Sequence, residues 1–376
     1  MKIAIVHEWL DTFAGSESVL AELLRIYPQA DLYAVVDFMD EAGRARLGDR
    51  RARTTFIQTL PFARRHFRLY LPLMPLAIEQ FDLSAYDLII SSSHAVAKGV
   101  ITRVGQVHVS YVHSPMRYAW DLTHDYLNRS GRGRWLKHWL LHRLRLWDSR
   151  TANGVDEFVA NSGFIGRRIW RCYRREAAVI HPPVHIDAFT PGDTHEDFYL
   201  AASRLVPYKR LDLVVEAFRQ LPDRRLVVIG DGPEMAAIRA VAGSNVAIMG
   251  YQPFEVLRDH MRRARAFIFP AIEDFGIIPI EAQACGTPVI AIGQGGTAET
   301  IRGLDHDQPS GVLFPRQNAD DIVAAIRRFE DESERITPQA CRANAERFSA
   351  ERFRAEFADF VAAALVRHGR TSGARP

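Results

Sequence analysis

Cysteine is scarce in this chain of 376 residues, which has three, at Cys172, Cys285 and Cys341. They lie far apart and match no spacing typical of a metal or redox site, so a reducing compartment is the simplest interpretation. No apolar run approaches the roughly 20 residues of a membrane span. The opening MKIAIVHEWL has one lysine and a short apolar run, so we expect a first strand there and not a signal peptide.

Two further absences narrow the function. The first strand is not followed by G-x-G-x-x-G, which weakens an interpretation as a nicotinamide dehydrogenase. No Asp-x-Asp stands in a metal-binding context, and we therefore expect no metal cofactor. The net charge of +3 is mild, so the composition as a whole does not favour a nucleic-acid-binding protein.

The hydrophobic pattern predicts an α/β protein. Charged residues at 25% and hydrophobic residues at 47% are typical of a soluble globular chain, and the length suits two domains. Short apolar runs such as KIAIV, YDLIISSS, FYLAAS and TPVIAI alternate with helical stretches, as in parallel sheets covered by helices. We therefore expect two doubly wound, Rossmann-like domains.

The proline-rich stretch AVIHPPVHIDAFTPGDTHED is interpreted as the linker between them. The predicted first domain covers 1–185 and the second 190–349. A helix at about 350–367 has apolar residues at helical spacing and is expected to pack back on the first domain. We expect residues 368–376 to be a disordered tail.

In such sheets, ligands bind at the carboxyl ends of the strands, so the loops after the strands are the places to search. Gly15 follows the first strand and precedes a helix, where a phosphate could approach backbone N–H groups. Gly230, in VVIGDGPE, could pass a nucleotide close to the backbone, although the same sequence makes a good generic turn. A plain strand-to-helix turn is an equal interpretation of Gly15.

The stretch SRLVPYKRLD puts Arg204 at a strand end and Lys209 at the start of the next helix. Cations there oppose the helix dipole, which makes sense if an anion lies between them. A guanidinium and an ammonium together suit a diphosphate. A solvated basic turn is the alternative, and Arg210 is interpreted in that way.

The stretch EDFGIIPIEAQACGTPVIA holds two glutamates eight positions apart, Glu273 and Glu281. Gly276 gives flexible backbone, and Pro279 fits the first turn of a helix. Carboxylates accept hydrogen bonds from pairs of hydroxyls, which suits sugar or ribose diols. Taken alone they could be unrelated surface charges, but the combination of strand end, glycine and helix start favours a site.

Together these stretches resemble the retaining glycosyltransferases of family 4, which have the GT-B fold of two domains facing a cleft. The family's Glu-x(7)-Glu pattern is present as Glu273 and Glu281, and SRLVPYKRLD is similar to its diphosphate-binding segment. The likeness covers nearly the whole chain and is strongest from 200 to 300. Within the family, VHEWL, YVHSPMRYAWD and EDFGIIPIEAQACGTPVIA look most like the bacterial O-antigen mannosyltransferases.

The resemblance implies roles for residues in both domains. The implied catalytic residues are His113, Arg204, Lys209 and Glu273, and the implied donor-binding residues are Gly15, Gly230, Phe275, Gly276, Ile277 and Glu281. Glu273 would contact hydroxyls of the donor sugar and Glu281 the ribose, while the two cations would neutralise the leaving diphosphate. His113 matches a pocket histidine near the donor sugar, whereas His108, in mid-strand, is interpreted as structural.

The first loop departs from the family pattern. Relatives often have Gly-Gly followed by a small residue, Glu and Arg, and here the order is Ala14, Gly15, Ser16, Glu17 and Ser18. This leaves open how closely the loop clasps a diphosphate or an acceptor.

The resemblance implies transfer of a hexose, most directly mannose from GDP-mannose, to a lipid-linked or polysaccharide acceptor. The alternatives are a glycosyltransferase that uses a UDP-sugar, a sugar-nucleotide epimerase of the same fold, and an inactive membrane-associated scaffold. The intact set of two cations and two glutamates favours transfer. We expect the protein in the cytoplasm, peripheral on the inner face of the plasma membrane, without a nucleic-acid partner.

A basic and aromatic surface supports that location. Between Asp49 and Glu79 there is no acidic residue, and RGRWLKHWLLHRLRLW further on is also basic. The predicted membrane or acceptor residues are Arg64, Arg65, Arg68, Trp135, Trp139 and Arg145. If RGRWLKHWLLHRLRLW forms a helix, its mixture of basic residues and tryptophans is typical of a helix that lies at the interface of an anionic bilayer. A core helix with a solvated basic side is the alternative.

Overall fold

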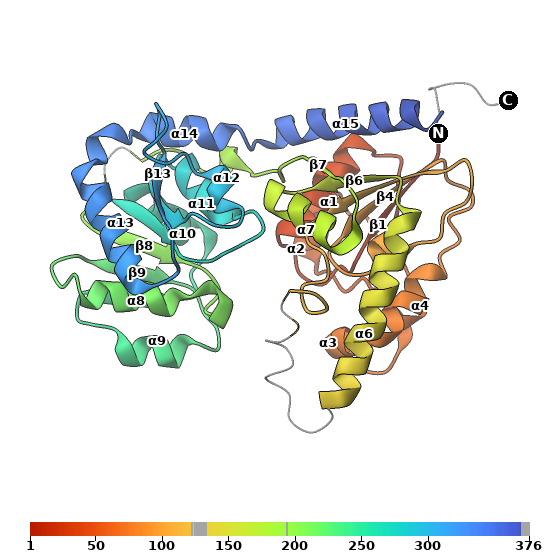
Figure 1. The fold of residues 1–376 in the computed structure, drawn as a ribbon, viewed down its shortest axis with the longest axis horizontal. Coiled ribbons are helices and arrows are strands. Elements are labelled where there is room, and N and C mark those ends of the chain that lie inside the picture. The colour runs from red at the N-terminus through yellow and green to blue at the C-terminus, as the bar shows by residue number, and fades with distance from the viewer. Residues whose placement is uncertain (122, 124–133, 193–194, 370–376) are drawn as a thin grey trace. The chain divides into compact units, whose positions relative to one another are not determined.

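The computed structural model describes residues 1–376 except 122, 124–133, 193–194 and 370–376 (Figure 1). The chain divides into two compact units: unit 1 is Met1–Pro183 with Phe353–Pro376, and unit 2 is Val184–Arg352. Each unit is a parallel sheet with helices on both faces, which confirms the predicted fold class. The predicted disordered tail lies, from residue 370 on, outside the described residues.

The sheet of unit 1 has the strand order β3-β2-β1-β4-β5-β6-β7. Its strands are β1 (Ile3–His7), β2 (Asp31–Ala34), β3 (Arg53–Thr54), β4 (Leu88–Ser93), β5 (Val107–Val112), β6 (Glu157–Ala160) and β7 (Ala178–Val179). The chain runs outward from β1 to β3 and then returns to the other side of β1 at β4. The order therefore reverses between β1 and β4, where open sheets of this kind bind ligands.

Apolar cores cover both faces of this sheet. The helices of unit 1 among the described residues are α1 (Gly15–Ile26), α2 (Glu41–Arg46), α3 (Ala63–His66), α4 (Met74–Glu79), α6 (Arg134–Thr151), α7 (Gly163–Tyr173) and most of α15 (Ala350–Arg367), with 3-10 turns η1 (Phe56–Thr59), η2 (Phe67–Leu73), η3 (Ala97–Gly99) and η4 (Ala152–Gly154). Ile3 and Ile5 face α1 and α15, whereas Ala4 and Val6 face the side covered by α4 and α6. This alternation is the period of two that strands impose.

The sheet of unit 2 has the order β10-β9-β8-β11-β12-β13. Its strands are β8 (Tyr199–Ala202), β9 (Leu226–Ile229), β10 (Val246–Gly250), β11 (Ala266–Phe269), β12 (Val289–Ile292) and β13 (Gly311–Phe314). The order reverses between β8 and β11. The loops after these two strands are therefore the first places to look for a ligand site in this unit.

The helices of unit 2 also cover both faces of its sheet. They are α8 (Leu211–Arg219), α9 (Met235–Val241), α10 (Phe254–Arg263), α11 (Ile277–Ala284), α12 (Thr297–Thr300), α13 (Ala319–Asp331) and α14 (Pro338–Glu346), with 3-10 turns η5 (Ile186–Ala188), η6 (Pro207–Lys209) and η7 (Ser333–Arg335). One core joins the sheet to α8 and α13, and the other joins it to α11 and α14.

Part of the stretch interpreted as a linker is built into unit 2. Val184, Ile186 and Phe189 are buried in the core beside α11, and Val184 donates its N–H to Phe348 O at 2.8 Å. The division between the units falls at Pro183 and Val184, within this stretch. The prolines of the stretch did not reveal that the apolar residues between them belong to a core.

The longest described helices, α6 and α15, have 18 residues each. Neither of these, nor any other helix in the described part of the chain, combines the length and the apolar composition needed to cross a bilayer.

Candidate functional site

In unit 2 the predicted residues gather at the carboxyl ends of β8 and β11. Arg204 and Lys209 follow β8, and Glu273 follows β11, the strand next to it. The ammonium of Lys209 forms an ion pair with Glu273 Oε1, and both side chains are largely buried, with 13% and 19% exposure. The structure therefore brings together two residues that lie 64 positions apart in the sequence.

The surroundings of Lys209 hold its charge in place. Its Nζ lies 5.5 Å from the ring centroid of Phe269 on β11 and 5.6 Å from that of Tyr208. Aromatic faces attract a cation within about 6 Å. Lys209 is thus a fixed cation beside a carboxylate, and not a mobile ammonium on a solvated turn.

Arg204 differs from Lys209 because its side chain is exposed. Among the described residues its guanidinium has no hydrogen-bond or ion-pair partner. Five N–H donors in a planar fork remain available, which suits an oxyanion such as a phosphate.

The structure shows a steric reason for glycine at position 230 that the sequence did not reveal. Its φ is +141°, and a Cβ built there would lie 1.8 Å from Ser203 O. The glycine therefore lets the loop after β9 press against the loop that carries Arg204. Its predicted contact with a nucleotide stays a prediction.

The second glutamate, Glu281, lies in α11 and is half-buried. Burial raises its pKa to about 7. Its carboxylate has no side-chain or backbone partner among the described residues. A desolvated carboxylate without a donor is well suited to accept hydrogen bonds from ligand hydroxyls.

Gly276 starts α11 with φ +87°, in the left-handed region that favours glycine. No side chain caps this helix, so Ile277 begins a helical turn whose first N–H groups have no intrahelical partner. Such groups attract anions. Phe275, by contrast, is buried and packs edge-on against Phe348 at 5.5 Å, so its side chain is part of the core.

The sequence analysis missed a glycine loop beside this site. Gly295 and Gly296 follow β12, and a Cβ on either would lie 2.4 Å from Glu273 O or 2.3 Å from Phe275 Cα. Gly296 also donates its N–H to Glu273 O at 2.8 Å. The sequence IGQGGTAE after a buried strand was the available signal, and its role is to hold the backbone that carries Glu273.

In unit 1, Gly15 follows β1, where the strand order reverses, and His113 follows β5, one strand beyond β4. Gly15 is the first residue of α1, and the N–H of Ala14 before it is already bonded to Glu17 Oε2 at 2.9 Å. A carboxylate of the chain thus occupies part of the place predicted for a phosphate. His113 lies just after β5 with its backbone fixed by Ser93 O, 2.8 Å away, and Asn161 Nδ2, 3.0 Å away.

His113 and His108 have different surroundings. Burial lowers the pKa of His113 well below the usual value, so the ring is neutral near pH 7. His108 is also buried, with a pKa lowered to about 4, and its two ring nitrogens lie at hydrogen-bond distance from Ser91 Oγ and Gly154 O. Its interpretation as structural fits these contacts.

Glu8, in the VHEWL stretch, is a further polar residue that the sequence analysis did not single out. Its buried carboxylate accepts hydrogen bonds from the backbone N–H groups of 94–97, at 2.7–3.1 Å, and from Ser93 Oγ at 3.1 Å. It therefore fixes the turn after β4, next to His113.

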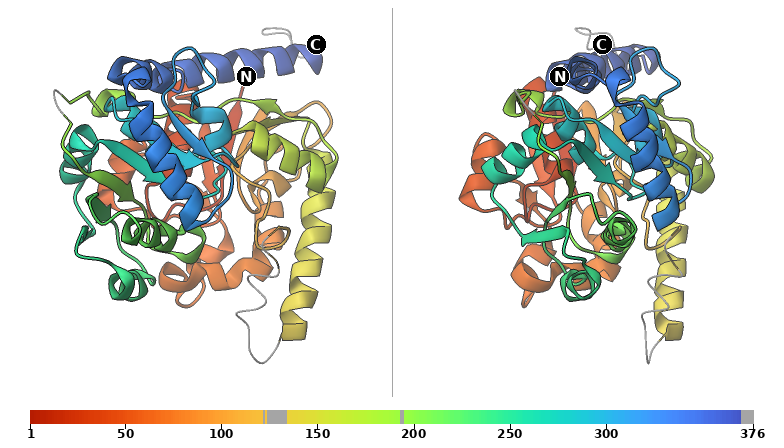
Figure 2. Two further views of the ribbon diagram at one scale, coloured as in Figure 1. Left: turned by 60° about the vertical axis from the view of Figure 1, so that its left-hand side comes forward. Right: turned by 90° about the vertical axis from the view of Figure 1, so that its left-hand side faces the viewer.

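The basic and aromatic surface of unit 1 is only partly free. Trp135 and Trp139 are 75% and 56% exposed in the first half of α6, which projects away from the rest of unit 1 in the views of Figures 1 and 2. Arg64 and Arg65 are exposed in α3. Arg145 differs, because its Nη1 turns inward to Ala119 O at 2.8 Å.

Arg68 is shared between solvent and the protein. Its guanidinium lies 3.2 Å from Asp11 Oδ2 and 4.5 Å from the ring centroid of Phe67. The core-helix interpretation holds for the second half of α6, and the membrane interpretation stays a prediction for the exposed first half. Leu144 is buried and Trp147 half-buried in the core of unit 1, whereas the residues from Arg134 to Trp139 are exposed.

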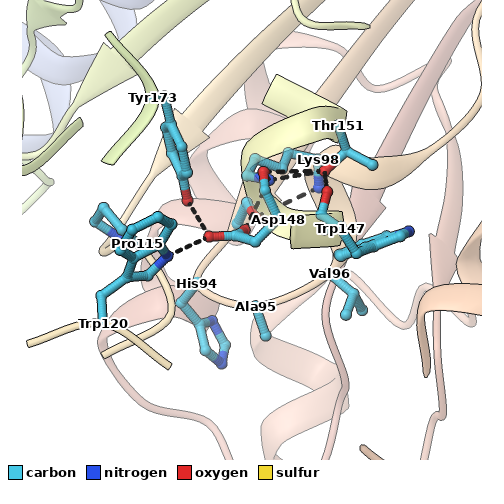
Figure 3. Close-up of polar contacts among 12 residues, drawn as sticks. His94, Ala95, Val96, Lys98, Pro115, Trp120, Trp147, Asp148, Thr151 and Tyr173 are labelled. Atoms are coloured by element: carbon cyan, nitrogen blue, oxygen red, sulfur yellow. Dashed lines mark hydrogen bonds and ion pairs between the residues drawn. The ribbon is translucent and has the colours of Figure 1, made fainter. Parts of the chain in front are cut away.

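A buried ion pair anchors the second half of α6 (Figure 3). Lys98 Nζ lies 2.8 Å from Asp148 Oδ1, and the two side chains are 2% and 0% exposed. Asp148 Oδ2 also accepts hydrogen bonds from Trp120 Nε1 at 2.7 Å and Tyr173 OH at 2.9 Å. One carboxylate thus ties α6 to η3, to the segment after β5 and to α7.

Comparisons with known proteins agree with this architecture. Residues 13–188 match the family model "Glycosyltransferase Family 4", and residues 186–348 match "Glycosyl transferases group 1". A D-inositol 3-phosphate glycosyltransferase of Mycobacteroides abscessus is 34% identical over 171 residues, which are 39% of this chain and 38% of that protein. The chain spans about half the length, or less, of the curated relatives it matches.

Solved structures extend the likeness over almost the whole chain. The Anabaena protein Alr3699/HepE, solved in complex with UDP, has a TM-score of 0.68 at 16% identity and covers 96% of this chain and 100% of its own. Sucrose-phosphate synthase from Thermosynechococcus elongatus has a TM-score of 0.70 at 17% identity and covers 98% and 100%. These identities are low, so the likeness to both structures supports the fold alone.

Proposed function

We propose that this GT-B chain transfers a sugar from a nucleoside diphosphate sugar to a hydroxyl of an acceptor. The matches of residues 13–188 to the Glycosyltransferase Family 4 model and of residues 186–348 to the group 1 glycosyl transferase model support this function. The observation that carries the proposal is the cluster at the carboxyl edge of the second sheet. It combines the fixed cation Lys209, its partner Glu273 and the free guanidinium of Arg204. Glu281 adds a carboxylate without a partner among the described residues.

In this reaction, the bond between the anomeric carbon and the phosphate oxygen breaks, and a bond to the acceptor oxygen forms. The leaving nucleoside diphosphate gathers negative charge, which fixed cations stabilise most strongly in the transition state. Arg204 and Lys209 would supply that charge without a metal. Glu273 would accept hydrogen bonds from the sugar and Glu281 from the ribose. The acceptor proton leaves with the diphosphate.

Two nucleotide sugars are candidates for the donor substrate. The sequence resemblance to O-antigen mannosyltransferases favours mannose from GDP-mannose with retention of configuration. The structural neighbour HepE was solved with UDP, which favours a UDP-hexose as the second candidate. A panel of GDP-, UDP- and ADP-sugars, with release of the nucleoside diphosphate as the readout, distinguishes the two donors.

The same assay tests the site. We expect Lys209→Ala and Glu273→Ala each to lower turnover by about a hundredfold, the usual loss for one fixed electrostatic group. Glu216→Ala, at an exposed position of α8, is the matched control and should leave turnover unchanged. Activity should persist in EDTA. Wild-type turnover in both site variants would refute the assignment, and loss of activity in EDTA would refute the metal-independent route.

We further propose that unit 1 binds an anionic membrane, where a lipid-linked acceptor would lie. The exposed tryptophans of α6, Trp135 and Trp139, together with the arginines Arg64 and Arg65, support this proposal. In low salt, vesicles of phosphatidylglycerol and phosphatidylcholine should sediment the protein, and Trp139→Ala should reduce this binding. Trp170→Ala removes a tryptophan of similar exposure, 50%, from α7 and serves as the control. Equal binding of both variants would contradict the proposal.

A further inference from the structure

Four side chains form a continuous row of hydrogen bonds at the carboxyl edge of the sheet in unit 1. Glu17 Oε1 lies 3.3 Å from His7 Nε2, and His7 Nδ1 lies 3.0 Å from Ser92 Oγ. Ser92 Oγ lies 2.8 Å from His113 Nε2. Glu17, His7 and Ser92 are 4%, 0% and 0% exposed. The four residues come from α1, β1, β4 and the end of β5, so only the fold brings them together.

The chemistry of each group sets the direction of this row. Burial alone would raise the pKa of Glu17, but hydrogen bonding and the charge interaction with His7 bring it down to about 2. The carboxylate is therefore ionised and can only accept, so His7 must donate from Nε2. In neutral His7 the other nitrogen, Nδ1, is then an acceptor, and the hydroxyl of Ser92 donates to it.

The remaining lone pairs of Ser92 Oγ face His113. They can accept a hydrogen bond only if His113 carries its proton on Nε2, and the ring is neutral near pH 7 because burial lowers its pKa. The other nitrogen, Nδ1, is then a bare acceptor. Among the described residues no hydrogen-bond partner of that nitrogen is found.

We propose that Glu17, His7 and Ser92 are positioning residues that hold His113 in the tautomer with its proton on Nε2, so that Nδ1 accepts a hydrogen bond from a sugar hydroxyl of the substrate. The proposal rests on the transferase function proposed above, because that function supplies the hydroxyl. The proposal goes beyond that function because it assigns a positioning role to three buried residues that do not contact the substrate.

The groups around His113 agree with this role. The ring of His94 lies 6.3 Å away and itself packs edge-on against Trp9 at 4.7 Å. Burial lowers the pKa of His94, and its ionisable neighbours are Glu8, His7, Glu17 and Arg117. The carboxylate of Glu8 is bound to the backbone N–H groups of the turn after β4. Tyr111, on β5, lies edge-on to His113 at 5.2 Å.

The test is a direct measurement of the tautomer in the full-length protein. Long-range proton–nitrogen spectra of protein labelled with 15N-histidine distinguish the two tautomers, and His7→Gln and His113→Gln assign the signals. In the wild type at pH 7.5, His7 and His113 should both carry the proton on Nε2. Ser92→Ala should leave His7 unchanged and convert His113 to a mixture of tautomers.

Two variants serve as controls for Ser92→Ala. Ser110→Ala removes a buried hydroxyl on β5 that has no hydrogen-bond partner among the described residues, and Ser92→Thr keeps the hydroxyl. Both should leave His113 with its proton on Nε2. A wild-type His113 with its proton on Nδ1, or a His113 tautomer unaffected by Ser92→Ala, would overturn the proposal.

A kinetic measurement then separates this proposal from the proposed function. Ser92→Ala should lower kcat about tenfold, the value of one hydrogen bond, with KM for the donor unchanged. Ser110→Ala and Ser92→Thr should retain the wild-type kcat. If no nucleotide sugar is turned over, the transferase proposal fails while the spectra still decide the tautomer. A wild-type kcat in Ser92→Ala overturns the role of the row in the reaction.

Discussion

Glu281 is a carboxylate whose environment costs the folded protein stability near neutral pH. Its pKa in the folded state is raised to about 7 by burial, whereas an unfolded glutamate has a pKa of about 4.3. Between these values the folded state holds a proton that the unfolded chain has lost. The contribution of Glu281 to the free energy of unfolding is therefore most favourable below about pH 4.3, and it is lost as the pH rises through about 7.

The substitution Glu281→Gln should remove this dependence. We expect its melting temperature to exceed that of the wild type by about 2 to 4 °C at pH 8.5, as about 1 kcal/mol produces in a unit of this size. The difference should shrink as the pH falls and vanish below about pH 4.3, where Glu281 is protonated in both the folded and the unfolded state. Differential scanning calorimetry over this range, with the exposed Glu216→Gln as the control, measures it. If the difference in melting temperature between Glu281→Gln and the wild type were the same at every pH, this would contradict the burial of the Glu281 carboxyl group.

Gly230 tests whether a glycine at a strand end serves the fold. A Cβ at this position would lie 1.8 Å from Ser203 O, and φ is +141°. Gly230→Ala should therefore destabilise unit 2 by about 2 kcal/mol or more, because the backbone has to move. Gly154→Ala is the matched control, since a Cβ there has no neighbour within 4 Å and φ is not positive. Urea unfolding of both variants measures the difference, and equal midpoints would contradict the steric argument.

At the scale of elements, one buried charge pair helps to anchor α6 in unit 1. Lys98 and Asp148 lie 2.8 Å apart, and removal of one partner leaves the other charge buried and uncompensated. We expect Asp148→Asn to cost about 3 to 5 kcal/mol of stability. The amide can still accept hydrogen bonds from Trp120 and Tyr173, so the loss of stability measures the effect of removing the negative charge.

Two further variants make this measurement specific. The double variant Lys98→Met with Asp148→Asn removes both charges and should recover part of the loss. Asp11→Asn breaks the exposed pair with Arg68 in the same unit and should cost less than about 1 kcal/mol. A double variant less stable than Asp148→Asn alone would show that shape, and not charge, dominates at this position.

The same helix shows what its sequence could and could not predict. The alternation of tryptophan, leucine and basic residues correctly predicted an amphipathic helix, and the two interpretations were a membrane-binding face and a core face. The second half packs on the core of unit 1, as the core-face interpretation expects, and the first half is exposed. Binding of that exposed half to a membrane stays a prediction. The helix changes from buried to exposed where α6 extends beyond the elements that cover it. The position of that change depends on the fold and cannot be predicted from the helical periodicity of the sequence.

At the scale of the whole molecule, the sequence predicted the sheets because parallel strands are continuous apolar runs. It placed Arg204 and Glu273 after strands because strand ends can be found in the sequence, and the functional roles of these residues, of Lys209 and of Glu281 stay predictions. It did not predict the ion pair of Lys209 with Glu273, which depends on β8 and β11 being neighbours. The row from Glu17 to His113 was missed for the same reason, since its members lie on four separate elements.

Unit 1 is completed by a segment from the other end of the chain. Phe353, Phe357, Val361 and Ala364 of α15 are at most 1% exposed in its core, and Arg354 bonds to Glu22 of α1 at 2.5 Å. A large buried aromatic residue contributes about 3 to 5 kcal/mol. The loss of two exceeds half of the usual stability of a domain.

We therefore expect a fragment of residues 1–183 to lack a cooperative thermal transition, whereas a fragment of residues 184–352, which is continuous, should melt cooperatively. Addition of a peptide covering 350–369 should restore a transition to the first fragment. The same peptide with Phe353→Ala and Phe357→Ala is the control and should not. Circular dichroism measures all four samples. A cooperative transition of 1–183 alone would mean that α15 only covers a core that is already complete, and the order of folding would then not depend on synthesis of the last helix.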